Sequence, residues 1–260
     1  MTAAPPPLAL DGAVLSVAKS AAEPSEDAAA LDLARGRVAV SDGATRAFAS
    51  GTWARCLVRR FVTRPPDALD ARALGRWTAE AAADWSHGVR LPPDAPPYLY
   101  DAVERGSHAT LLGLVAEPGR DGAGGVRWRA VAVGDTCLMT LTGDALRGSF
   151  PLDRPDQFTS APALLPTAPG ALPQAVAAAR VASGACGAGD VLLVMTDALA
   201  RWSLERAARG PRVWRFLRGA APEEFASEVR ALWRRGELEE DDITLVRCRV
   251  GGAAPDLPAR

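Results

Sequence analysis

The sequence has few of the residues on which several common kinds of site are built. Its 260 residues include two histidines and a single lysine, Lys19, and no H-E-x-x-H zinc motif occurs. Four cysteines form no C-x-x-C pair, and each lies in or beside an apolar stretch: Cys56, Cys137, Cys186 and Cys248. This placement is typical of buried thiols in a reducing compartment rather than of disulfides or zinc ligands.

Long apolar runs and an excess of charge are missing as well. No apolar stretch approaches the ~18 residues of a membrane-spanning helix. The formal net charge of -1 gives no attraction to nucleic acid or to an anionic membrane. The Pro-rich residues 1–10 lack a basic leader followed by an apolar core, so no secretory signal is expected. We therefore expect a cytoplasmic protein, monomeric, with neither nucleic acid nor membrane as a partner.

The hydrophobic pattern predicts many short strands and two helical blocks. Strands are expected at residues 13–19, 27–33, 37–41, 107–116, 126–134, 136–141, 144–149, 191–195 and 243–250. Helices are expected within 45–105 and 198–235, and a short one at 171–182. Asp67 is the predicted cap of the second helix, and the Pro-rich stretch 151–170 is predicted to be irregular. Closely spaced strands indicate antiparallel pairing.

The pattern also predicts the layers of the fold. Residues 191–195 are apolar at every position, which indicates a strand covered on both faces. Helices on the outer faces of two packed sheets would explain this, so we expect an α+β fold, a four-layer αββα sandwich of two antiparallel sheets flanked by helices. We expect one domain over residues 13–250, preceded by a flexible segment, 1–12, and followed by a disordered tail, 251–260.

Three aspartates follow or precede apolar strands. Asp42 shares parity with Val40, Asp197 follows the strand at 191–195, and Asp241 precedes the strand at 243–250. If the apolar faces of matching parity point between the sheets, the three carboxylates meet at one edge of the core. Unpaired buried carboxylates are costly, and the nearby sequence offers few cations to neutralise them. Mg²⁺ and Mn²⁺ prefer such oxygen ligands, so the pattern predicts a divalent-metal site suited to hydrolysis of a phosphate ester.

Other readings apply to some of these residue types. A lone aspartate at a strand end is usually a turn former or a helix cap, but the number and shared placement of these carboxylates favour the metal site. Asp135 and Asp190 each follow a glycine, and for both we favour turn chemistry. We interpret His108 as a packed or partly exposed strand residue. The tryptophans in the predicted helices are interpreted as core.

Six segments, in order along residues 25–250, resemble motifs of the bacterial PP2C-type (PPM) metal-dependent protein phosphatases. Each segment alone is a weak signal, whereas six in the right order are specific. They are 25–28 (SEDA), 38–43 (VAVSDG), 106–110 (GSHAT), 133–138 (VGDTCL), 189–197 (GDVLLVMTD) and 241–246 (DDITLV).

The resemblance implies the αββα fold and a dinuclear Mn²⁺ or Mg²⁺ centre. By motif position, Asp42 would bridge both metals. Asp197, Asp241 and the carbonyl of Gly43 would bind one metal, and Glu26 would help to hold the other. Asp27 and Asp242 would support these ligands from behind.

The resemblance also implies an activity. The nucleophile would be a metal-bridging water positioned by Asp42 and Asp197. The substrates would be phosphoserine and phosphothreonine in proteins, made by a serine/threonine kinase, which implies a role in signalling.

The chain departs from the family pattern at several positions. Ala22 stands where the family often has a phosphate-binding Arg, so Lys19 and Arg46 are our candidates for that role. Glu104 is the nearest acidic residue for the family's weaker third metal. Three further differences are Ala198 for Gly, Asp242 for Asn, which we interpret as mild, and Thr136-Cys137 for Ser-Arg.

Two alternatives to a protein phosphatase stay open. Loss of the phosphate-binding Arg favours a catalytically weak or inactive module that binds phosphoproteins, whereas the retained carboxylates oppose it. A small-molecule phosphatase is the other alternative, because the substrate surface of such a fold lies in variable loops.

Overall fold

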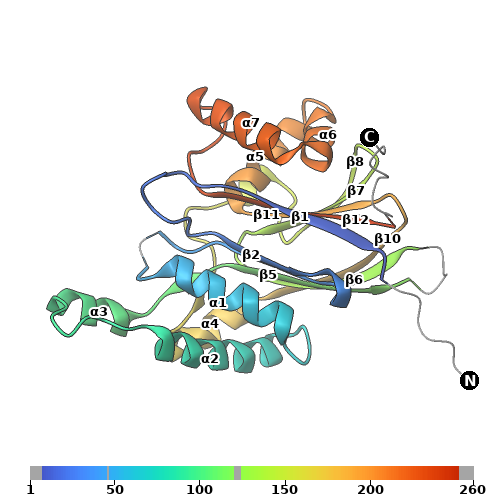
Figure 1. Cartoon of the computed structure of the whole chain (residues 1–260). Helices are drawn as coiled ribbons and strands as arrows, with labels where there is room; N and C mark the ends of the chain where they lie inside the picture. The colour runs from blue at the N-terminus through green and yellow to red at the C-terminus, as the bar shows by residue number, and fades with distance from the viewer. Residues whose placement is uncertain (1–7, 46, 120–123, 252–260) are drawn as a thin grey trace, which may run out of the picture.

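The structure is a computed structural model, and it describes residues 8–45, 47–119 and 124–251. Ten of its strands form two five-stranded antiparallel sheets (Figure 1). The first sheet has the order β1 (Leu10–Val17), β12 (Ile243–Val250), β11 (Val191–Met195), β7 (Cys137–Thr142) and β8 (Ala145–Phe150). The second has the order β10 (Arg180–Cys186), β6 (Val126–Val133), β5 (Leu111–Pro118), β3 (Arg37–Ser41) and β2 (Ala28–Asp32). Two short strands, β4 (His108–Ala109) and β9 (Leu165–Pro166), pair separately.

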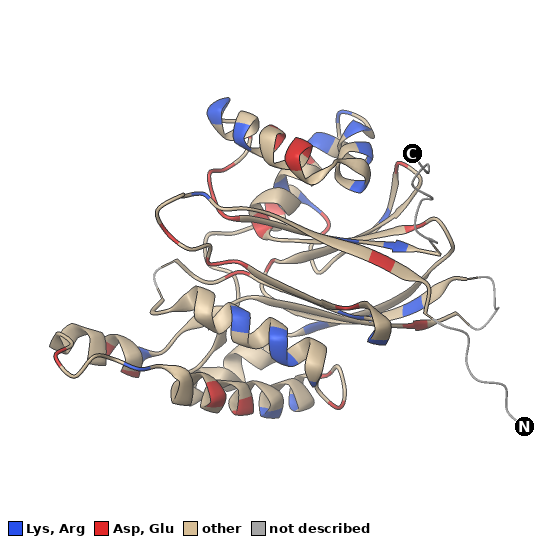
Figure 2. Ribbon diagram, viewed as in Figure 1, with Lys and Arg blue, Asp and Glu red and all other residues tan. Residues whose placement is uncertain are grey.

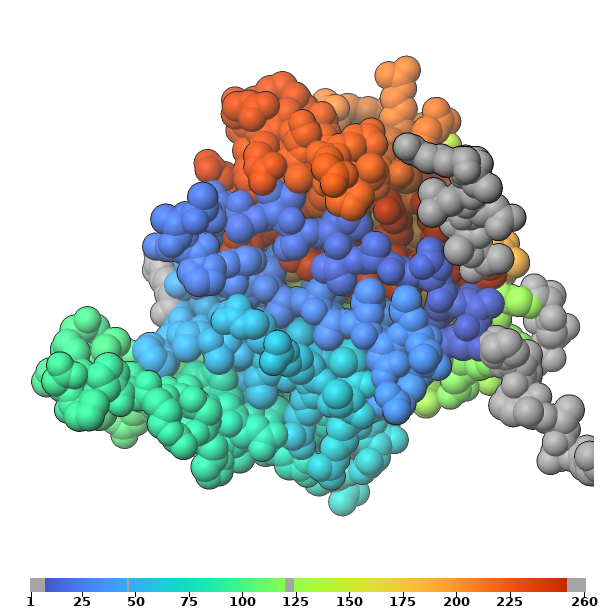
Figure 3. Space-filling model, in the orientation of Figure 1, coloured from blue at the N-terminus to red at the C-terminus, as the bar shows by residue number. Residues whose placement is uncertain are grey.

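Helices cover the outer face of each sheet. The first sheet carries α5 (Asp197–Ala207), α6 (Arg212–Gly219) and α7 (Pro222–Arg234). The second carries α1 (Ser50–Thr63), α2 (Ala71–Gly88) and α4 (Leu172–Ala177). A further helix, α3 (Pro97–Arg105), projects from the body of the protein as the green lobe of Figure 3. The predicted αββα sandwich is confirmed.

Three apolar cores separate the four layers. One lies between the sheets and joins Val38 and Val40 to Leu192 and Val194. The other two lie between each sheet and its helices. Each central strand therefore buries both of its faces, which is why residues 191–195 are apolar at every position.

The predicted direction of the carboxylate-bearing faces is corrected by these cores. Val40, which shares parity with Asp42, points between the sheets as expected. Met195 and Leu245, which share parity with Asp197 and Asp241, instead face the helices α5–α7. Parity could not distinguish the two faces because strands β11 and β12 are apolar on both.

Several element boundaries also differ from the prediction. Strand β1 begins at Leu10, within the segment predicted to be flexible, and residues 1–7 and 252–260 lie outside the described residues. Helix α2 is capped by Asp70, whose carboxylate accepts the Ala73 N–H at 2.8 Å, and not by Asp67. The helix predicted at 171–182 ends at Ala177, and from Arg180 the chain forms the edge strand β10.

The cysteines and the helices can be compared with what the sequence predicted for them. The cysteines carry free thiols, with Cys137, Cys186 and Cys248 buried. In helix α1, Trp53, Leu57 and Phe61 form a fully buried stripe, as their spacing predicted. Of the helices within the described ranges, none combines the length and apolar character needed to cross a membrane.

One close contact in the core between the second sheet and its helices gives a test of the fold. Gly113 on β5 lies against the ring of Phe61, and a Cβ added at Gly113 would overlap that ring. We expect Gly113→Ala to lower the free energy of unfolding by about 1–3 kcal/mol, because the packed helix cannot retreat without loss of contacts. Gly148→Ala on β8, whose added Cβ meets only Thr140 Oγ1 at 3.4 Å, is the matched control. Equal stability of the two variants in denaturant unfolding would contradict the packing described here.

Candidate metal centre

The register of the two sheets brings the predicted aspartates to one end of the sandwich. Asp27 precedes β2 and Asp42 follows β3, and these strands pair antiparallel with Ala28 opposite Ser41. Asp197 follows β11 and Asp241 precedes β12, and those strands pair with Met195 opposite Leu245. In Figure 2 several acidic segments gather at the corresponding left-hand end of the sheets.

Asp27 joins the two sheets at this end. Its Oδ2 accepts a hydrogen bond from Thr196 Oγ1 at 3.1 Å, and the polar side chain of Thr244 also acts on this carboxyl. The other oxygen, Oδ1, is buried without a hydrogen-bond partner among the described residues. Burial raises the pKa of Asp27 well above its ordinary value, and the charges of Asp242 and Asp197 raise it further against the two threonines. This carboxyl is therefore short of positive charge.

The carboxyl of Asp42, like that of Asp27, has a raised pKa. Burial raises the pKa of the Asp42 carboxyl, and four neighbouring carboxylates raise it further: Asp27, Asp197, Asp241 and Asp135. No described residue donates a hydrogen bond to the Asp42 carboxylate, although its backbone N–H donates to Thr110 Oγ1 at 2.9 Å. The residues predicted from strand ends thus form one cluster in space.

Asp197 opens helix α5, where the helix dipole favours a negative charge. Its Oδ1 accepts the N–H of Ala198 at 2.7 Å. Burial nevertheless raises the pKa of Asp197, and the nearby carboxylates of Asp241 and Glu239 also raise it. The fold therefore keeps the Asp197 and Asp42 carboxylates close together although their charges repel.

Asp135 is a member of the cluster that the sequence interpretation missed. It was assigned to turn chemistry, yet it is 4% exposed and lies close enough to influence both Asp42 and Asp197. Burial, with a contribution from Asp197, raises the pKa of Asp135 from 3.8 to about 7. The signal was its position after β6, at another strand end. Asp190 behaves as predicted, since its Oδ2 accepts the Gly187 N–H in a turn, whereas Glu104 lies exposed on α3.

Asp242 holds the loop that carries Lys19 and Glu26. Its Oδ1 accepts the Lys19 N–H at 2.9 Å, and its Oδ2 accepts the Glu26 N–H at 2.8 Å. Both oxygens of this buried carboxylate are therefore engaged by backbone donors. Asp242 thus fixes the loop on which Glu26 lies. An Asn in its place would not be the mild change that we expected, because an amide has only one acceptor oxygen.

Glu26 is fixed from several directions. Its Oε1 accepts a hydrogen bond from Ser50 Oγ, at the first turn of α1, at 2.6 Å. Its backbone lies against Gly43 and Gly51, where an added Cβ would approach the Glu26 main chain to 2.9 and 3.0 Å respectively. The Asp42-Gly43 segment and the Glu26 loop are thus packed directly together.

The two predicted phosphate-binding cations have different outcomes. Lys19 Nζ forms ion pairs with Glu26 Oε2 at 3.2 Å and with Asp241 Oδ1 at 2.9 Å. Its ammonium therefore contacts predicted metal ligands in this arrangement. Arg46 lies outside the described residues.

The chemistry of the cluster fits a hard divalent cation. The donors are carboxylate oxygens, one of them buried without a partner, and their raised pKa values reflect uncompensated negative charge. Among the residues that the structure describes, no three carboxylate, imidazole or thiol groups are arranged to hold a metal as they stand. Protein donors occupy one oxygen each of Asp197 and Asp241 and both oxygens of Glu26.

Two of the surface cavities bear on where the site lies. One, of about 490 Å³, adjoins Gly43 and is lined by Ala44, Thr45, Ala47, Phe48, Ala102, Arg105, Gly106, His108 and Leu164. The Ala44 N–H donates to the His108 carbonyl at 3.0 Å, which ties this cavity to the strand end bearing Asp42. Burial lowers the pKa of the half-buried His108, which conforms to its interpretation as a partly packed strand residue.

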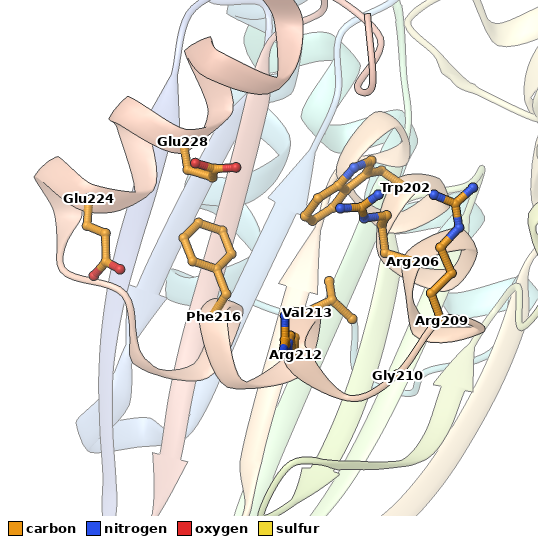
Figure 4. Close-up of a pocket in the computed structure, with 9 residues that line it drawn as sticks. All are labelled: Trp202, Arg206, Arg209, Gly210, Arg212, Val213, Phe216, Glu224 and Glu228. Carbon is orange, nitrogen blue, oxygen red and sulfur yellow. The ribbon is translucent and has the colours of Figure 1, made fainter. Parts of the chain in front are cut away.

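The other cavity, of about 430 Å³, lies among the outer helices α5, α6 and α7 (Figure 4). Figure 4 shows Glu224 and Glu228 on α7, separated by Phe216 from Trp202 and Arg206 on α5. It contains none of the predicted metal ligands, so we do not assign the site to it.

Comparisons with known proteins agree with this architecture. The sequence matches no family model and no curated protein. Among solved structures, the Mycobacterium tuberculosis serine/threonine phosphatase PstP is similar over 94% of this chain and 100% of its own, with a TM-score of 0.61 and 17% identity. A catalytic domain of PstP in complex with two manganese ions has a TM-score of 0.60 at 17% identity, over 94% of this chain and 99% of its own. PppA of Pseudomonas aeruginosa has a TM-score of 0.57 at 19% identity, over the same shares. The fold is therefore that of the PP2C-type phosphatases which the sequence resembles, and that resemblance is confirmed at the level of structure.

The role of Asp242 can be tested through stability. Asp242→Asn removes one of two acceptors and leaves a buried backbone N–H facing an amide group, so we expect a loss of about 1–3 kcal/mol in the free energy of unfolding without metal. Asp190→Asn is the matched control, because Asp190 uses a single oxygen and lies in an exposed turn. A loss of the same size in both variants would contradict the role of Asp242 in holding the loop through both of its oxygens.

The buried Asp135 predicts a dependence on pH. Its folded pKa of about 7 exceeds its ordinary 3.8, so Asp135 destabilises the native state increasingly as the pH rises from about 4 to about 7. Asp135→Asn should therefore gain stability relative to wild type over this window, by on the order of 2–4 kcal/mol at pH 8. The check is denaturant unfolding of both proteins in a chelating buffer from pH 4.5 to 8. A stability difference that does not change with pH would show that Asp135 has no raised pKa.

Proposed function

We propose that this protein is a metal-dependent phosphatase that hydrolyses phosphoserine and phosphothreonine in proteins, with two Mn²⁺ or Mg²⁺ ions as cofactors. One observation carries the proposal: five aspartates gather at one end of a PP2C fold, and the charges of the other four raise the pKa of Asp42. The five are Asp27, Asp42, Asp135, Asp197 and Asp241. Buried carboxylates collected in this way require positive charge.

The described residues supply little of that charge. Lys19 is the one cation in the described ranges that forms an ion pair with any of these carboxylates. Two divalent ions would supply the remainder, and when bound they lower the pKa of a coordinated water and neutralise charge on a phosphoryl group. The PstP structure solved with two manganese ions, on the same fold, supports this assignment.

The protein's own residues would hold and orient that centre. Asp42, Asp197, Asp241 and the carbonyl of Gly43 would bind the metals, and Glu26 would help to hold one of them. Asp27 would keep its unpartnered oxygen directed into the cluster while Thr196 holds the other.

The cavity beside Gly43 supports an anionic protein substrate. Its lining includes Arg105 and the half-buried His108, and none of the described lining residues carries a carboxylate. Helix α3, which contributes Arg105, also exposes Tyr98 and Tyr100, at 65% and 50%, on a segment that projects from the fold. A projecting aromatic surface beside a cavity lined by Arg105 suits a peptide chain better than a small metabolite. The cytoplasmic location and the monomeric state stay predictions.

The direct test is hydrolysis of a phosphothreonine peptide with and without Mn²⁺. We expect metal-dependent turnover by the wild type, and a loss of at least about 100-fold in kcat for Asp42→Asn and Asp197→Asn, because each removes a charged ligand. Binding of the phosphopeptide without turnover would favour the non-catalytic module. Turnover of small phosphate esters but of no phosphopeptide would favour a small-molecule phosphatase.

The cavity assignment predicts a separation of KM from kcat. Arg105→Ala should raise KM for a phosphopeptide by about 5- to 10-fold with little change in kcat, and should leave p-nitrophenyl phosphate hydrolysis unchanged, because only the peptide reaches that cavity. Arg209→Ala, in the distant cavity of Figure 4, is the matched control. An equal effect on both substrates would contradict a peptide-binding role.

A further inference from the structure

The single lysine of the chain lies inside the carboxylate cluster. Lys19 Nζ spans Glu26 Oε2 at 3.2 Å and Asp241 Oδ1 at 2.9 Å, two residues separated by more than two hundred positions in the sequence. The Lys19 side chain is 25% exposed, so most of it is enclosed by the site. One ammonium therefore links the loop before β2 to the segment before β12.

The backbone holds Lys19 in this place. Asp242 accepts the N–H groups of both Lys19 and Glu26, which fixes the two ends of the loop between β1 and β2. Burial opposes ionisation of Lys19, but hydrogen bonds and charges from Asp241 and Glu26 outweigh it, and its pKa is raised. The ammonium is thus a permanent positive charge in the cluster at neutral pH.

The ammonium contacts oxygens of two predicted metal ligands. Asp241 Oδ1 accepts from Lys19 and also from the Asp242 N–H at 2.8 Å. Both oxygens of Glu26 are engaged, one by Ser50 and one by Lys19. A divalent ion bound to Asp241 in this arrangement would lie within a few ångströms of a positive charge, which is unfavourable in a partly buried site.

We propose that Lys19 is a built-in cation that occupies the Glu26–Asp241 side of the centre and competes with a divalent ion for it. Without metal, Lys19 holds the repelling carboxylates together. When the ion binds, the flexible Lys19 side chain leaves Asp241 and turns toward solvent. The competition lowers the affinity of the site for metal, so metal occupancy depends on the concentration of the ion. This inference rests on the metal-binding part of the proposed function.

Calorimetric titration with Mn²⁺ tests the competition. Lys19→Met keeps most of the unbranched side chain and removes its charge, so we expect Mn²⁺ to bind at least about 10-fold more tightly than to wild type. Lys19→Arg, which keeps the charge, should remain within about 3-fold of wild type. Arg55→Met controls for the loss of a nearby surface charge, since Arg55 contacts the carbonyl of Ser25 on the same loop without touching a carboxylate of the cluster. Unchanged or weaker binding by Lys19→Met overturns the proposal.

A second measurement uses the fact that Lys19 is the only lysine. Acetylation of its amine by a mild reagent, followed by mass spectrometry of the Lys19 peptide, reports how exposed the side chain is. We expect Mg²⁺ or Mn²⁺ to increase the acetylation rate of the wild type several-fold, and acetylation that metal leaves unchanged or slows overturns the proposal.

The outcomes separate this inference from the proposed function. Equal Mn²⁺ affinities of wild type and Lys19→Met, with metal-dependent phosphatase activity present, reject the competition and leave the function standing. Failure of both proteins to bind Mn²⁺ rejects the competition and the metal-dependent function together.

Discussion

Repulsion among buried carboxylates is the constraint on which the rest of this structure depends. Asp27, Asp42, Asp135 and Asp197 lie at one end of the sandwich, and burial together with their mutual charge raises their pKa values. A fold that brought them together without compensation would lose stability, because each buried negative charge is costly. The native fold therefore requires positive charge at this end of the sandwich.

The fold supplies the means to hold these groups against that repulsion. Antiparallel pairing within each sheet places strand ends side by side, and Asp27 connects the sheets through Thr196. Asp242 fixes the loop that carries Lys19, whose ammonium provides the nearest positive charge. The three apolar cores make this framework stiff, so the site does not relax simply by separating its carboxylates.

Much of the fold and part of the site could be predicted from the sequence. Short strands with doubly apolar runs indicated two sheets between helices, and Asp42 and Asp197 were recognisable because each ends such a run. Asp135 was missed because Gly-Asp at a strand end is equally a turn signal. The contact between Lys19 and Asp241 joins distant segments, so local pattern carries no trace of it. The faces of β11 and β12 could not be assigned because both are apolar.

On the proposed function, this carboxylate cluster holds divalent cations. The most direct measurement is a crystal structure of the protein grown with Mn²⁺, with anomalous scattering recorded at the manganese edge. We expect two anomalous peaks in contact with the Asp42 carboxylate, one of them also bound by Asp197 or Asp241, and Lys19 Nζ moved away from Asp241. A map without peaks at saturating Mn²⁺, with Lys19 still bridging Glu26 and Asp241, would contradict it.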